Sequence, residues 1–258
     1  MNRLILILFV VFMAVVPQWS ATPEFWVTQL NYIGLASLVV LGLVLLTGVG
    51  GLTSFGQAAF VGLGAYTTAY LTTAVGWSPW LALIVGLLLT LAVAYILGAI
   101  TLRLSGHYLP LGTIAWGLSL YYLFGNMGFL GQYDGIAGIQ PVNVFGFSLA
   151  SGREIFYLIW VCVLLAMWGT YNLLNSRPGR AIRALKSGSV MAESFGINMA
   201  SYKIIIFVYA ALLACVSGWL YAHMQRAVSP SPFGLNYGIE YLFMAVVGGS
   251  GSVWGAIV

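Results

Sequence analysis

The 258-residue chain is 61% hydrophobic and 5% charged, with a mean hydropathy of +1.00. Soluble domains carry about a quarter charged residues, so this composition excludes a water-soluble fold. The net charge of +4 does not indicate a nucleic-acid partner, because the basic residues are concentrated at the ends of apolar segments. Continuous apolar runs exclude a membrane barrel and predict an all-α polytopic membrane protein in a lipid bilayer, with about eight transmembrane or re-entrant helical segments.

The first apolar run, 1–18, is short enough to be a signal peptide. No small-residue cleavage site precedes Pro17 and Trp19, so we favour a retained first helix, with cleavage as the alternative. Glu24 and Trp26 would then lie at the outer interface, where tryptophan is enriched.

The second predicted span, 31–47, leads into a glycine-rich break over 48–57, GVGGLTSFGQ. A helix resumes over 58–74, where Ala58 and Gly62 have the four-residue spacing that lets helix backbones approach closely in lipid. Irregular backbone at membrane depth persists only where protein or a water-filled cavity satisfies it. The break therefore predicts either part of a translocation pathway or a cytoplasmic turn.

Five further apolar segments follow: we predict spans over 79–102, 108–126, 154–174 and 204–224, and an eighth hydrophobic segment over 239–258. The sequence GGSGS interrupts the last of them, which ends as GAIV inside an apolar run. We expect this chain to be a truncated part of a longer protein, the alternative being a short final segment. The two cysteines lie in different apolar segments and predict buried core residues, with no metal site.

Basic residues are distributed unequally between the two sides of this topology. With the N-terminus inside, most of them are cytoplasmic: Arg3, Arg103, Arg177, Arg180, Arg183, Lys186 and Lys203. Only Arg153 and Arg226 fall outside. Since the spans were drawn without using charge, this bias predicts a cytoplasmic N-terminus.

The longest polar stretch, 175–203, is cytoplasmic in this topology. Asn175 or Ser176 can cap a first short helix, residues 190–195 can form a second, and Gly196 can close it with a positive φ. Scattered basic residues alone would be enough to fix topology. Two capped helices with an apolar stripe therefore favour a docking surface over a simple loop.

Five ordered motifs resemble a known family. GLTSFGQAAFVGLGAYTTA, LRLSGHYLPLGTIA, GQYDGIAGI, GRAIRALKSGSVMAESFGIN and IEYLFMAVVGGSGSVWGA resemble segments of ABC importer permeases for branched-chain amino acids, most closely the second permease type of these systems. The resemblance covers nearly the whole chain from about Asn31 onward. It departs from the family pattern at 187–189, where acids are usual, and at Pro110, where a small residue is usual.

The resemblance implies a single transmembrane permease domain over 1–258 in the bacterial inner membrane, translocating branched-chain or other neutral amino acids. It implies a periplasmic substrate-binding protein, a second permease subunit, and two ATP-binding subunits or a fused ATPase domain. The chain itself would be no enzyme and would hold no cofactor, since ATP and Mg²⁺ would bind to the ATPase and no GxxxxGK[ST] motif occurs here.

Three groups of site residues follow from the resemblance and from the polar side chains near the break. The ATPase-coupling group is Gly179, Arg180, Ala181, Arg183, Ala192, Glu193 and Gly196. The predicted translocation pathway is Ser54, Gly56, Gln57, Phe60, Tyr66 and Thr113. The structural glycines are Gly51, Gly62, Gly64, Gly248, Gly249 and Gly251.

Other functions are open at this stage. A urea or short-amide ABC permease is the nearest alternative. A stand-alone secondary transporter or channel would need internal repeats and buried coupling charges, for which Glu240 is the one candidate, and an interfacial position is its simpler interpretation. A membrane enzyme would need a His, Asp or Cys constellation, which the sequence lacks.

Overall fold

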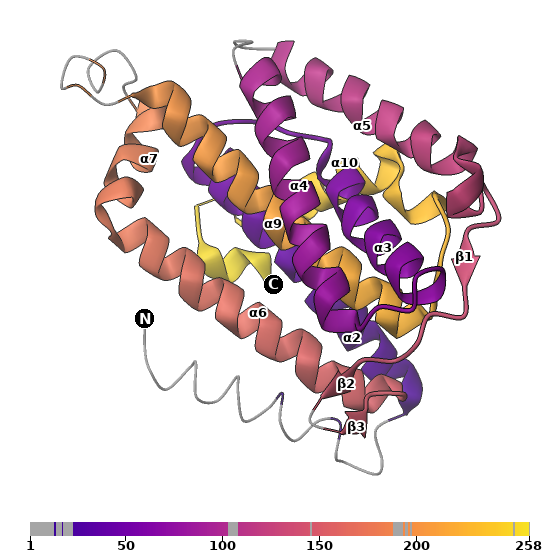
Figure 1. Cartoon of the computed structure of the whole chain (residues 1–258). Helices are drawn as coiled ribbons and strands as arrows, with labels where there is room; N and C mark the ends of the chain where they lie inside the picture. The colour runs from indigo at the N-terminus through magenta and orange to yellow at the C-terminus, as the bar shows by residue number, and fades with distance from the viewer. Residues whose placement is uncertain are drawn as a thin grey trace.

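A computed structural model describes residues 23–102, 108–144, 146–187, 198–249 and 251–257, together with Met13, Pro17, Glu193 and Gly196. This part of the chain folds as a helical bundle (Figure 1). Its helices are α2 (Glu24–Leu43), α3 (Gln57–Thr73), α4 (Pro79–Thr101), α5 (Tyr108–Asn126), α6 (Gly152–Asn175), α7 (Arg177–Ser187), α9 (Met199–Gln225) and α10 (Leu235–Val247). The first predicted span, 1–18, lies outside the described residues apart from Met13 and Pro17.

The chain is an all-α, multi-pass membrane protein. Four described helical segments are long and apolar enough to cross a membrane: Glu24–Val49, Pro79–Thr101, Gly152–Asn175 and Met199–Gln225. α10 has only 13 residues, or about 20 Å at 1.5 Å per residue, which is shorter than the hydrocarbon core of about 30 Å. The eighth predicted hydrophobic segment, 239–258, is divided between this short helix and a separate 3₁₀ turn, Val253–Ala256.

One predicted span begins too late. α2 starts at Glu24 rather than at residue 31; the polar residues Glu24, Thr28 and Gln29 of its first turns are exposed, whereas Asn31 is buried. The Asn31 amide donates to the Gly152 carbonyl at 2.9 Å. α9 starts at Met199, and the Asn198 side chain accepts from the Ser201 N–H and caps the helix. At its other end α2 continues as a π-helix, Val44–Val49.

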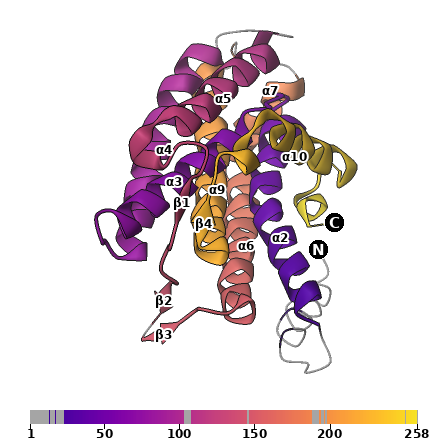
Figure 2. The same cartoon turned by 90° about the vertical axis from the view of Figure 1, so that its right-hand side faces the viewer.

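Helix α3 forms the centre of the bundle, with 13 of its 17 residues buried. Figure 2 shows α4 and α5 on one side of the bundle and α2 and α10 on the other. A Cβ added at Gly64 would collide with the backbone of Cys215 in α9, and one added at Gly218 in α9 would collide with the Val61 carbonyl. The close approach of α3 and α9 therefore depends on one glycine in each helix, Gly64 and Gly218, each facing the backbone of the other helix.

The predicted Ala58–Gly62 pair is not what brings α3 against a neighbouring backbone. Gly62 faces the aromatic rings of Phe124 and Phe233, while Gly64, two residues further on, meets α9. The Ala58–Gly62 spacing correctly predicted that α3 packs closely against another helix. Because α3 has small residues on several faces, the sequence did not predict which face makes that contact.

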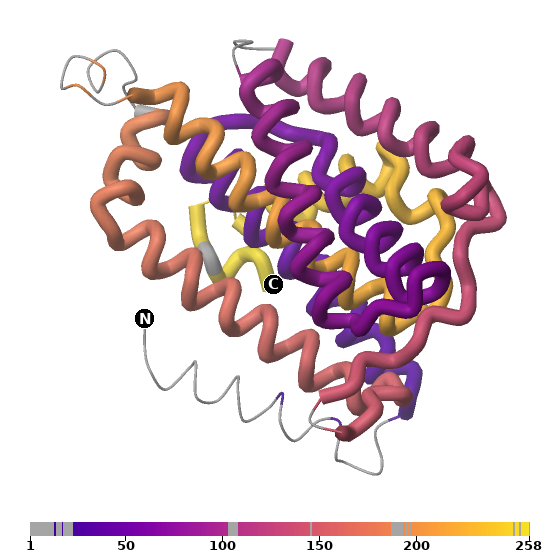
Figure 3. The backbone as a smooth tube through the Cα atoms, viewed as in Figure 1, coloured from indigo at the N-terminus to yellow at the C-terminus, as the bar shows by residue number. Residues whose placement is uncertain are grey.

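The two ends of the bundle differ. At one end β1 (Ile136–Ala137) pairs antiparallel with β4 (Ala227–Val228), and β2 (Asn143–Val144) pairs with β3 (Phe147–Ser148). The outer arginines predicted from charge belong to this end, where the Arg226 guanidinium donates to the Ala150 carbonyl. α7 lies at the opposite end (Figure 1). Figure 3 traces the chain past α10 to the 3₁₀ turn, which packs beside α2 and α6.

We predict that Gly64→Ala lowers the stability of the folded protein by about 1–3 kcal/mol, because the added methyl group overpacks the α3–α9 contact. The midpoint of thermal aggregation of detergent-solubilised protein measures this. Gly86→Ala in α4 is the matched control, since its new Cβ would lie 3.6 Å from the Cys215 sulfur in ordinary contact. Equal midpoints for the two variants would contradict the assignment.

Candidate functional site

Several backbone groups of the glycine-rich break after α2 are hydrogen-bonded, although the break is not helical. The Gly50 N–H donates to the Leu45 carbonyl at 3.0 Å, and the Leu52 N–H donates to the Leu46 carbonyl at 3.0 Å. The Thr47 hydroxyl donates back to the Leu52 carbonyl at 3.1 Å. These bonds reach from the π-helix into the break and satisfy groups that the hydrocarbon core could not.

Two other helices supply the remaining partners of the break. The Phe55 N–H donates to the Thr113 hydroxyl of α5 at 3.1 Å, and that hydroxyl donates to the Pro110 carbonyl at 2.8 Å. From α7, the Lys186 ammonium donates to the Gly48 carbonyl at 3.1 Å. The break is therefore fixed by contacts from two separate parts of the fold.

The predicted pathway residues lie together in and beside the break, α3 and α5. Ser54 and Gln57 are buried, and neither side chain has a hydrogen-bond partner among the described residues. The Phe60 ring lies 4.9 Å from that of Trp116, and the Tyr66 ring stacks on Phe124 at 4.9 Å between centroids.

The two other members of the predicted pathway also belong to this cluster. Gly56 lies against the Trp116 ring and the Thr113 carbonyl, and Thr113 is fully buried. Gly56, Phe60 and Tyr66 thus contact α5, to which Thr113 belongs. The place of all six residues in a substrate pathway stays a prediction.

The predicted coupling residues divide between two faces of α7. Gly179 and Ala181 are buried, while Arg180 and Arg183 are exposed. The helix begins as expected, with the Ser176 hydroxyl accepting from the Gly179 N–H at 3.4 Å. On the buried face, Ile182 belongs to the same hydrophobic cluster as Leu45 and Leu46 of the π-helix.

Only part of the second predicted short helix is described. Ala192 lies outside the described residues. The Gly196 N–H donates to the Glu193 carbonyl at 2.9 Å, and Gly196 has a φ of +80°. This confirms the positive φ predicted for Gly196, whereas its part in ATPase coupling stays a prediction.

The remaining predicted structural glycines have different surroundings. Gly51 has a φ of +69° and lies beside the Lys186 side chain, with 3.5 Å from its Cβ position to Cγ. Gly248 lies directly against the Gly255 backbone, which lets the chain turn back after α10. Gly249 has a φ of +103°, and neither it nor Gly251 has a neighbour within 4 Å of a Cβ position.

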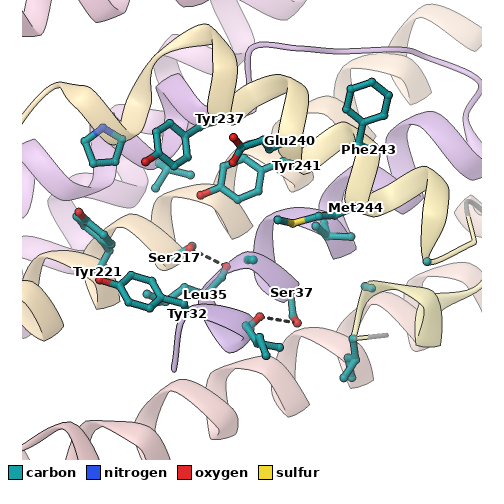
Figure 4. Close-up of a pocket in the computed structure, with 18 of the residues that line it drawn as sticks. Tyr32, Leu35, Ser37, Ser217, Tyr221, Tyr237, Glu240, Tyr241, Phe243 and Met244 are labelled. Atoms are coloured by element: carbon teal, nitrogen blue, oxygen red, sulfur yellow. Dashed lines mark hydrogen bonds between the residues drawn. The ribbon is translucent and has the colours of Figure 1, made fainter. Parts of the chain in front are cut away.

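A cavity of about 800 Å³ lies between α2, α9 and α10 (Figure 4). None of the six predicted pathway residues lines it; α3 contributes Val61 instead. Its polar lining groups come from three helices: Gln29, Tyr32, Ser37, Ser217, Tyr221, Tyr237, Glu240 and Tyr241. The two serines are already occupied, since Ser37 donates to the Ile33 carbonyl at 2.7 Å and Ser217 to the Leu35 carbonyl at 2.8 Å.

The sequence analysis singled out Glu240 but missed the tyrosines around it. Figure 4 shows the Glu240 side chain next to Tyr241, with Tyr237 on the same helix. Tyr237 and Tyr241 are four residues apart and flank Glu240, a spacing that places aromatic rings beside an acid on one helix face. That pattern was visible in the sequence, but the contribution of Tyr221 from α9 was not.

We predict that Thr113→Val lowers stability by about 1–3 kcal/mol, because it leaves the buried Phe55 N–H without an acceptor while keeping the side-chain shape. The same thermal measurement applies. Ser119→Ala is the control, since this exposed hydroxyl of α5 bonds only to the Ala115 carbonyl of its own helix, at 2.9 Å. A Thr113→Val midpoint equal to that of the control would show that the break does not depend on α5.

The sequence of the chain has clear relatives among characterised proteins. It is 30% identical over 242 residues to the high-affinity branched-chain amino acid transport system permease protein LivM of Escherichia coli, covering 84% of this chain and 57% of LivM. It is 37% identical over 128 residues to BraD of Pseudomonas aeruginosa, a permease protein of the same description, covering 48% of this chain and 41% of BraD.

A third relative is the probable branched-chain amino acid transport permease protein LivH of Methanocaldococcus jannaschii, at 28% identity over 88% of this chain and 74% of LivH. The chain thus spans little more than half the length of LivM. No solved structure matches it significantly. Residues 25–258 match the family model for the permease component of the branched-chain amino acid transport system. The chain belongs to this permease family.

Proposed function

We propose that the chain is the permease subunit of an ATP-driven importer for branched-chain or other neutral amino acids, delivered by a periplasmic binding protein. It would act in the bacterial inner membrane with its N-terminus in the cytoplasm. A second permease subunit and two ATP-binding subunits, or a fused ATPase domain, would complete the transporter and hold ATP and Mg²⁺. The relatives LivM and BraD, described as branched-chain amino acid permeases, support this substrate class.

The observation that carries the proposal is the construction of α7. This helix lies at the end of the bundle away from the β-strands and is basic on its exposed face (Figure 1). Its other face is anchored by Ile182, which is fully buried, and by Leu185, which is 9% exposed. A helix held on one side by the core and exposing Arg180 and Arg183 on the other suits docking of an acidic or polar protein surface.

We assign the docking of the ATPase to the exposed part of α7 and to the segment that follows it. The residues proposed for this contact are Gly179, Arg180, Ala181, Arg183, Ala192, Glu193 and Gly196. Gly179 and Ala181 would act by seating α7 on the bundle, since both are buried.

The Lys186–Gly48 hydrogen bond supports a route from this docking face into the membrane. Lys186 belongs to α7, whereas Gly48 belongs to the π-helix that leads into the break. A displacement of α7 would therefore act directly on the break, without passing through the length of a transmembrane helix. We propose that ATP-driven movement reaches the membrane domain through this contact.

We predict that Arg180→Glu weakens the association of the ATPase with the full-length permease about tenfold or more, because it reverses a charge on the docking face. Co-purification of the ATPase from detergent-solubilised membranes measures this. Asp134→Lys reverses a charge in the exposed loop at the opposite end and serves as control. Undiminished co-purification of the ATPase with Arg180→Glu would contradict docking on α7. In a separate uptake assay, transport of labelled urea but not of leucine would contradict the proposed substrate class.

We predict that Lys186→Met lowers leucine uptake several-fold while ATP hydrolysis by the assembled transporter continues. The variant keeps the apolar stem of the side chain but removes the donor to the Gly48 carbonyl. Lys186→Arg, which can still donate, should retain more uptake. A parallel fall in hydrolysis and uptake would indicate lost assembly instead of lost coupling.

A further inference from the structure

The cavity between α2, α9 and α10 contains a carboxylate without a cationic partner. Among the described residues that line it, Glu240 is the one charged side chain. The described part of the chain provides no ion pair for Glu240. Its position in the middle of α10 follows from packing, since α10 lies against α2, α3 and the π-helix.

The cavity reaches into a membrane span. The α2 residues that line it run from Gln29, near the start of the span Glu24–Val49, to Val40 in its middle part. An ionised side chain at that depth is costly unless it faces a water-filled cavity or meets an opposite charge. Glu240 is exposed and faces the cavity. A bound ligand could supply the opposite charge.

Aromatic rings lie beside Glu240. Tyr237 and Tyr241 are its neighbours on α10, and Tyr221 of α9 lines the same cavity (Figure 4). The face of a tyrosine ring attracts a cation electrostatically, most strongly in a desolvated site. A carboxylate together with tyrosines is therefore a suitable receptor for an ammonium group.

The rest of the cavity wall is apolar. Leu35 and Val40 of α2, Val61 of α3 and Met244 of α10 contribute aliphatic surface. The volume of about 800 Å³ leaves room for a small molecule and water. An apolar wall with a few convergent polar groups is the usual form of a small-molecule site.

We propose that this cavity binds an aliphatic amino acid during transport, with Glu240 receiving the ammonium group and the apolar wall receiving the side chain. The inference rests on the proposed function and deepens it, because it assigns the amino-acid contact to α10 instead of the Ser54–Thr113 cluster. The break connects the two regions: a Cβ added at Gly238 of α10 would collide with the Phe55 carbonyl. Movement of the break would thus displace the helix that carries Glu240.

Chemical modification tests the site directly, without requiring transport. Dicyclohexylcarbodiimide reacts with carboxyl groups in apolar surroundings, and mass spectrometry locates the adduct. In the full-length permease in membranes, leucine and 3-methylbutylamine should each protect Glu240 from modification, whereas 4-methylpentanoate, which lacks the ammonium group, should not. Equal modification in the presence and absence of both amines would overturn the proposal, as would protection by 4-methylpentanoate equal to that by leucine.

Uptake assays test the same residue in the assembled transporter. We predict that Glu240→Gln lowers the initial rate of leucine uptake about tenfold or more, because the charge-assisted contact is lost. Removing a charge at membrane depth should not impair folding. Glu240→Asp should retain part of the activity, and Glu24→Gln, at the exposed start of α2, should leave it unchanged.

The outcomes separate this inference from the proposed function. If the wild-type transporter takes up leucine and Glu240→Gln takes it up equally well, the site is refuted and the importer function stands. This result is expected if the carboxylate only reaches the membrane interface, or if another protein segment fills the cavity. If the wild-type transporter takes up no neutral amino acid while leucine still protects Glu240, the site stands and the proposed transport function fails.

Discussion

The structure depends on how a stretch of non-helical backbone is satisfied within a membrane domain. Between the π-helix and α3 the chain leaves helical hydrogen bonding, and any such backbone that lies at membrane depth needs partners from the protein or a water-filled cavity. Nearby carbonyls of the π-helix, the Thr113 hydroxyl and the Lys186 ammonium take over as partners. Because these partners come from different elements, the positions of α5 and α7 are tied to one short segment of the chain.

Close packing around α3 explains why this arrangement is rigid. Glycines at the α3–α9 contact remove the space between the two backbones, so α3 cannot rotate or slide without overlapping its neighbour. The break is attached to the start of this fixed helix. It therefore connects the closely packed centre with two further elements: α7 at the end of the bundle and α10 beside the cavity. A displacement of α7 or of α10 would therefore act on the residues of the break.

The sequence predicted the class of fold, most helices and the break, because apolar runs, glycine clusters and charge asymmetry are local properties. It also placed the caps at Ser176 and Gly196, where side-chain chemistry decides the geometry. It did not predict the early start of α2, since the partner of Asn31 is the distant Gly152. Nor did it predict the cavity, because its tyrosines come from three helices and meet only through tertiary packing.

The π-helix at the end of α2 has a mechanical consequence. A π-turn contains one residue more than an α-turn, so converting one into the other shifts the following chain by one residue of helical register. In an α-helix that step is about 1.5 Å along the axis and about 100° around it. Any such change at Val44–Val49 would occur in a discrete step and would turn the break instead of merely bending it. The π-turn thus sets the helical register with which the chain enters its least regular segment.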